Sequence, residues 1–64
     1  MYEKPKINEI HKCQIQGFGK QGDAICKVNK FVIFVSKPKG LVGDYIKIKI
    51  TQVFRKIGFG EIVD

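Results

Sequence analysis

Apolar and polar side chains alternate along several short stretches of this chain, and no helix-length stretch repeats them at the helical period. Residues 45–50 read YIKIKI, with isoleucine at every second position and lysine between them. A period of two is the pattern of a strand that buries one face and exposes the other. This stretch therefore predicts a half-buried β-strand.

The pattern predicts four further strands, at residues 9–17, 23–28, 31–35 and 57–63. The third of these, FVIFV, is apolar in both phases, so it needs a partner on each face, and one partner need not be protein. In the last strand Gly58 and Gly60 alternate with Phe59, which predicts a close backbone approach on the glycine side and a ring on the other side. Five short strands with glycines at the bends predict an all-β fold, a small five-stranded barrel, because closure removes exposed sheet edges.

Residues 17–22, GFGKQG, spell the G-x-G-x-x-G pattern of dinucleotide-binding proteins. That pattern works only where a helix begins at the third glycine, whereas the residues after Gly22 are rich in β-branched and aromatic types. We therefore expect a turn between two strands and no NAD or FAD. A turn centred between Gly19 and Lys20 would make Ile15 face Ala24 and Cys13 face Cys26.

Positive charge is concentrated in the middle of the chain, whose formal net charge is +6. Between residues 20 and 56, nine lysines and arginines stand against two aspartates. Such a stripe can be a solvated face that only keeps the protein soluble. Five phenylalanines near these cations favour a surface for single-stranded nucleic acid, because cations follow phosphates and each ring offers a base a platform of about 1–3 kcal/mol.

The candidate binding residues combine these rings and cations. Phe34 is the ring we most expect on the surface, because Lys30 and Lys37 stand close to it in sequence. Arg55 can fork onto a phosphate or stack on a base, although it can also be a surface residue without a role. We expect two or three of the phenylalanines in the core. The predicted site consists of Phe18, Lys20, Lys30, Phe31, Phe34, Lys37, Lys39, Lys47, Arg55, Lys56 and Phe59.

Catalysis and metal binding receive little support from the residue types. One histidine and six scattered carboxylates offer no pair for acid–base chemistry, so we expect no enzyme and no cofactor. His11, Cys13 and Cys26 would give zinc three ligands where a structural site wants four. The apolar runs are far shorter than the roughly 20 residues of a membrane span. Two cysteines in so short a chain suggest free thiols and a cytoplasmic protein.

Several motifs in order resemble the TRAM domain. They are the run from Ile15 through Phe18 to Gly22-Asp23, the FVIFV stretch, Gly43-Asp44 before the alternating isoleucines, and GFGEI at residues 58–62. Ala24 and Ser36 depart from the glycine and proline that the family usually has there. The resemblance implies an OB-like barrel over residues 8–64, after a tail of residues 1–7. It also implies RNA binding, as in the small archaeal TRAM proteins regarded as RNA chaperones.

Two classes of function follow from these observations. The first is a monomeric RNA-binding protein of low sequence specificity, acting on single-stranded or misfolded RNA, with no small-molecule substrate and no membrane partner. The second is a ribosome-associated or protein-interaction barrel that docks on a fixed partner. Binding to phosphates depends steeply on salt, whereas a hydrophobic protein contact is nearly independent of it.

Overall fold

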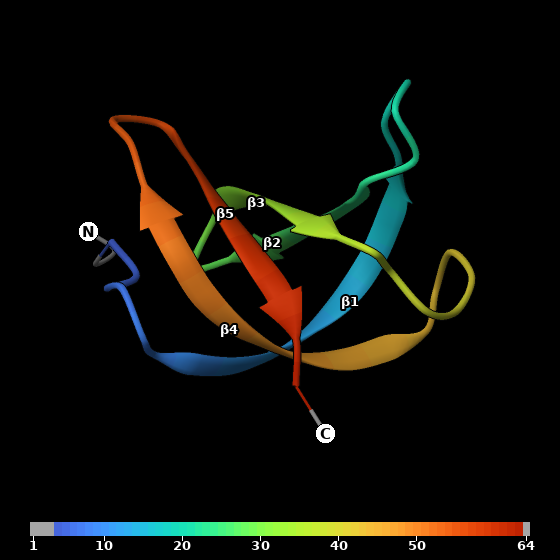
Figure 1. The fold of residues 1–64 in the computed structure, drawn as a ribbon, viewed down its shortest axis with the longest axis horizontal. Coiled ribbons are helices and arrows are strands. Elements are labelled where there is room, and N and C mark those ends of the chain that lie inside the picture. Colours follow the sequence, from blue (N-terminus) through green and yellow to red (C-terminus); the bar gives the residue numbers. More distant parts are fainter. Residues whose placement is uncertain (1–3, 64) are drawn as a thin grey trace.

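The computed structural model describes residues 4–63, so the first three residues of the expected tail and Asp64 lie outside the described part of the chain. Five strands form one closed barrel in the order β1-β2-β3-β5-β4 (Figure 1). This confirms the predicted five-stranded barrel. The strands are β1 (Ile10–Phe18), β2 (Ala24–Val28), β3 (Phe31–Ser36), β4 (Tyr45–Val53) and β5 (Ile57–Ile62).

Closure of the barrel depends on the long, curved strand β4. Its first half pairs with β1, from Tyr45 opposite Gln14 to Lys49 opposite Ile10. Its second half pairs with β5, and the register shifts between Ile50 and Gln52. All neighbours are antiparallel except β3 and β5, which run parallel. One strand therefore joins both edges of the sheet, as Figure 1 shows for the orange ribbon.

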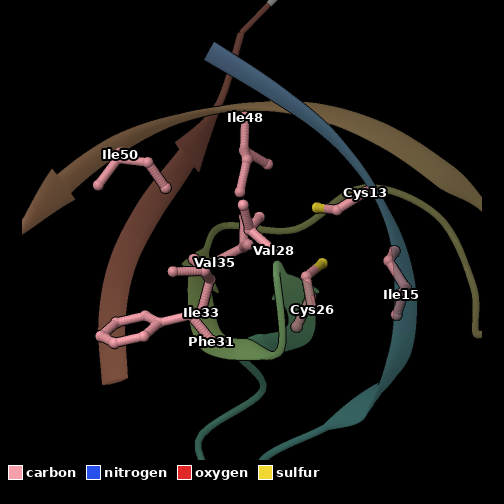
Figure 2. Close-up of a cluster of buried hydrophobic side chains, with 10 residues drawn as sticks. Cys13, Ile15, Cys26, Val28, Phe31, Ile33, Val35, Ile48 and Ile50 are labelled. Atoms are coloured by element: carbon pink, nitrogen blue, oxygen red, sulfur yellow. The ribbon is translucent and has the colours of Figure 1, made fainter. Parts of the chain in front are cut away.

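The core is built by every second residue of the strands, as the alternation predicts. The fully buried side chains come from β1, β2, β3 and β4 and meet inside the barrel (Figure 2). Ile33, Ile48 and Ile50 are completely buried. The ten core residues are Cys13, Ile15, Ala24, Cys26, Val28, Phe31, Ile33, Val35, Ile48 and Ile50.

Strand β5 contributes two glycines to the inside, and its Ile62 side chain packs partly buried against the core. A Cβ atom on Gly58 would lie 2.9 Å from the carbonyl oxygen of Gln52 and 3.0 Å from Cδ1 of Ile33. A Cβ atom on Gly60 would lie 3.0 Å from the carbonyl oxygen of Lys49. The predicted close approach on the glycine side is confirmed, and it lets β4 and β3 pack directly against the β5 backbone.

The GFGKQG stretch is the end of β1 and a loop that leads into β2, with no helix after it. The amide of Gly19 donates to the carbonyl of Asp23 at 2.8 Å, and Gly22 has a φ of +88°. Positive φ costs glycine no steric clash, which explains why the chain turns there. The predicted strand turn is confirmed.

The register predicted for the β1–β2 hairpin is wrong. Ile15 faces Cys26 and Phe18 faces Ala24, with a shift between Ile15 and Gly17. The loop closes from Gly19 to Asp23 and is therefore centred on Gln21, whereas the prediction centred it between Gly19 and Lys20. The bulge between Ile15 and Gly17 then shifts the pairing back by one residue, so Ile15 faces Cys26 instead of the predicted Ala24.

Candidate nucleic-acid interface

Three aromatic rings in contact lie on the outside of the barrel, two on the parallel pair β3–β5 and one in the turn before β5. Phe34 and Phe59 stand opposite each other in the register. Both side chains point outward, because they alternate along their strands with buried residues that point inward. Their ring centroids are 5.9 Å apart, and Phe54 meets Phe59 edge-on at 5.6 Å. We call Phe34, Phe59 and Phe54 the aromatic row. Phe54 is 49% exposed, whereas Phe34 and Phe59 are half-buried.

Two hollows follow this strand pair. The next outward residues after Phe34 and Phe59 are Ser36 and Glu61, which also face each other. Each pair of positions lines one hollow, so the hollows succeed each other along the strands. The first, of about 330 Å³, is lined by Gly19, Lys20, Gln21, Asp23, Phe34 and Phe59. The second, of about 300 Å³, is lined by Ser36, Lys37, Lys39, Glu61 and Ile62.

Cations stand at both ends of the strand pair. The turn Asn29–Lys30 and the turn that carries Arg55 and Lys56 precede β3 and β5, which run in the same direction. Asn29 and Lys30 have φ angles of 51° and 68°, as a two-residue hairpin turn requires. At the other end, Lys20 reaches the first hollow and the loop after β3 supplies lysines to the second.

These cations are free of intramolecular ion pairs to the described carboxylates. Between residues 4 and 63 the one pair within 4.0 Å is His11 with Glu9, at 3.0 Å. The backbone amide of Lys6 donates a hydrogen bond to the Glu9 carboxylate and lowers the pKa of Glu9, and the hydrogen bond with the His11 side chain lowers that pKa further. No ion pair within residues 4–63 therefore neutralises the lysines and the arginine of this face.

The structure places two predicted site residues, Phe31 and Lys47, away from the aromatic row. Phe31 is 3% exposed and belongs to the core, because it points to the inside where Phe34 points out, so its place among the RNA-contacting rings is corrected. Lys47 lies opposite Lys12 on the outer face of β1 and β4, apart from the aromatic row. Phe18 is 42% exposed at the end of β1, next to the loop that lines the first hollow.

Sequence reasoning left Phe54 out of the site, although the structure joins it to Phe59. The amide of Phe54 donates to the carbonyl of Ile57 at 2.7 Å, which closes the turn after β4. Phe54 lies outside the strands, so the alternation of apolar and polar residues does not predict which way its side chain points. Its position directly before Arg55 and Lys56 was the available signal.

The two thiols belong to the core and not to a reactive site. Cys13 and Cys26 are both free and buried, and their side chains point toward each other (Figure 2). Burial, with the Cys26 thiol beside it, raises the pKa of Cys13 to about 12, and burial also raises the pKa of Cys26. Both are neutral at neutral pH.

Among residues 4–63 no group of three or more His, Cys, Asp or Glu could hold a metal ion, and no helix is long and apolar enough to cross a membrane.

Fold and surface together define a small β-barrel domain with a cationic and aromatic outer face. The TRAM domain family matches residues 4–63, and the chain belongs to that family. TRAM domains are generally RNA-binding domains. The match leaves no separate catalytic domain within these residues.

Two archaeal proteins are similar to most of the chain. An uncharacterized protein of Methanocaldococcus jannaschii is 38% identical over 56 residues, which are 88% of this chain and 70% of that protein. The solution structure of a conserved protein of Methanococcus maripaludis matches with a TM-score of 0.78 and 34% identity, over 92% of this chain and 81% of that one.

Two longer proteins contain a similar segment. The ribosomal RNA large subunit methyltransferase E of Methanocella arvoryzae is 48% identical over 50 residues, which are 78% of this chain and 19% of the enzyme. The translation initiation factor 2 subunit beta of Methanothrix thermoacetophila is 36% identical over 56 residues, which are 88% of this chain and 26% of the factor. The chain thus spans about a fifth to a quarter of these relatives.

Proposed function

We propose that this protein binds single-stranded or misfolded RNA with low sequence specificity along the outer face of β3 and β5. In this role it acts as an RNA chaperone of the cytoplasm, a monomer without cofactor or catalytic activity. We place the domain at residues 8–64, whereas the family match begins at residue 4. Holding single strands prevents them from returning to misfolded pairings, which is the contribution a small barrel can make without consuming energy.

The aromatic row is the observation that carries this proposal. A half-buried ring held by two others is a rigid platform, and any base can stack on it because every base has a π-face. Cations at both ends of the strand pair are placed to follow the phosphates on either side of the stacked bases. Readout by base edges needs polar groups set against each base, whereas rings and lysines accept any sequence.

Fluorescence anisotropy with short labelled RNAs of unrelated sequence tests the proposal. We expect similar affinities for all of them, and a preference of about a hundredfold or more for one sequence would contradict low specificity. A duplex of the same length should bind more weakly, because its bases are already stacked on each other.

Salt dependence separates this function from docking on a fixed protein partner. If about five phosphates are neutralised on a single strand, the logarithm of the affinity should fall with the logarithm of salt at a slope near −3.5. A nearly flat dependence of the binding of a partner protein, together with no RNA binding, would favour the protein-interaction alternative.

A further inference from the structure

The loop between β3 and β4 presents two consecutive aliphatic side chains to solvent. Leu41 is 74% exposed and Val42 is 60% exposed. Single exposed aliphatic residues are ordinary on protein surfaces, but these two are neighbours at the tip of one turn. Figure 1 shows this loop standing out from the barrel beside β1.

The turn that carries them is held in one conformation. The amide of Asp44 donates to the carbonyl of Leu41 at 3.0 Å, and the Leu41 amide donates to Oδ2 of the Asp44 carboxylate at 2.8 Å. Gly43, at the third position of the turn, has a φ of +96°, which suits a type II turn. The two side chains are therefore presented by a closed turn and not by a loose loop.

Strand β1 fixes this turn to the barrel. The Gly43 amide donates to the carbonyl of Ile15 at 2.8 Å, and the Ile15 amide donates to the carbonyl of Asp44 at 2.9 Å. The side chain of Gln14 donates through Nε2 to the Gly43 carbonyl at 3.0 Å. These hydrogen bonds make the turn rigid, so Leu41 and Val42 keep their position when another molecule contacts them.

Lysines lie on both sides of the turn, and the acidic residues near it are Asp44 of the turn and Glu61 of the second hollow. Lys37 and Lys39 precede it in the same loop and line the second hollow, which continues the aromatic row. On its other side Tyr45 is 64% exposed, and Nζ of Lys12 lies 5.6 Å from the centroid of its ring. An anionic partner is therefore complementary to the charge on both sides of the apolar tip.

We propose that Leu41 and Val42 form a wedge that enters between the last stacked base pairs of an RNA duplex and separates its strands. The inference rests on the proposed function, because an RNA strand held on the aromatic row and in the second hollow brings its paired segment to this turn. Apolar side chains inserted at a base step are an established means of unstacking nucleic acids. The released strand can then pass onto the aromatic row.

A hairpin RNA with a single-stranded tail, labelled with a fluorophore and a quencher on the two strands of its stem, tests the wedge. The double variant Leu41→Ser with Val42→Ser should open the hairpin about tenfold less well than the unchanged protein, because the unstacking contact is gone. Its affinity for an unpaired labelled RNA should stay within about twofold, since neither a charge nor a stacking ring is removed. The variant with Leu41→Met and Val42→Ile should retain opening.

The matched control is the double variant Ile7→Ser with Ile10→Ser, which removes two side chains of 56% and 50% exposure away from the turn. It should open the hairpin as well as the unchanged protein does. Equal opening by the Leu41→Ser, Val42→Ser variant would overturn the wedge, as would equal losses of opening and of single-strand affinity. Sedimentation measures whether the unchanged protein associates with itself as its concentration rises. Self-association that the Leu41→Ser, Val42→Ser variant abolishes and the control variant retains would overturn the wedge in favour of a contact between two copies. Absence of any RNA binding by the unchanged protein would instead refute the proposed function itself.

Discussion

The inner and outer faces of the strand pair β3–β5 use the same kinds of residue for opposite purposes. Inside, Phe31 and Ile33 pack against the bare backbone of Gly58 and Gly60. Outside, Phe34 and Phe59 touch each other and leave part of each ring uncovered. Phe31 and Phe34 are three positions apart, an odd number, so the pleat sends them to opposite faces. The position of a phenylalanine in the alternation of β3 therefore determines whether its ring packs in the core or lies on the outer face.

The two faces also differ in what they tolerate. The inner face has no spare volume beside the β5 glycines, so added atoms there must displace backbone. The outer face borders two hollows and can lose a ring without leaving a void inside the protein. Mutations on the inner face should therefore act on stability, and mutations on the outer face on binding.

Among these variants, Phe31→Ala on the inner face should lower the free energy of unfolding the most. Truncation of a buried phenylalanine costs about 3–5 kcal/mol, which is a large share of the total stability of so small a domain. The free energy of unfolding, measured by chemical denaturation, should fall by that amount or the variant should be unfolded. Phe34→Ala is the matched control and should lose clearly less, because its ring is only half-buried. Equal losses from both variants would contradict the assignment of faces.

Gly58→Ala should also destabilise the barrel without touching the outer face. The new methyl group would meet the carbonyl oxygen of Gln52 at 2.9 Å, and a backbone atom cannot move aside as a side chain can. We expect a loss of about 1–3 kcal/mol in the free energy of unfolding. Gly17→Ala is the control, because a Cβ there meets nothing within 4 Å, and it should change stability by less than about 0.5 kcal/mol.

Phe59→Ala should weaken RNA binding by about 1–3 kcal/mol, since it removes the middle ring of the aromatic row. No charge is lost, so the salt dependence of binding should keep its slope. Anisotropy titrations at several salt concentrations measure both quantities. A changed slope with unchanged affinity at low salt would mean that the ring does not stack on bases.

Alternation in the sequence predicted the strands and the inside of the barrel because it records which face of each strand is buried. Alternation could not predict the β1–β2 register. That register depends on the backbone conformation, which closes the loop from Gly19 to Asp23 and forms a bulge after Ile15. The same limit applies in β4, where a register shift after Ile50 lets the strand continue to Val53 beyond the regular alternation.

The candidate site was less predictable than the fold. FVIFV is apolar in both phases, so its sequence could not tell that Phe31 lies inside and Phe34 outside until the neighbouring strands were placed. Lys47 shares the outward phase of its strand, but β4 turns that part toward β1 and away from the aromatic row. Phe54 lies in a turn, where alternation carries no information.

The smallest expected effect belongs to single cations and compares the two outer faces of the barrel. Arg55→Ala should flatten the log–log salt slope of RNA binding by about 0.7, because one counterion fewer is released from a single strand. Lys47→Ala removes the same charge from the face of β1 and β4 and should leave the slope unchanged. Neither variant should melt at a noticeably different temperature, since both side chains are exposed. If Lys47→Ala flattens the slope as much as Arg55→Ala does, the RNA follows a path around the barrel rather than along β3 and β5.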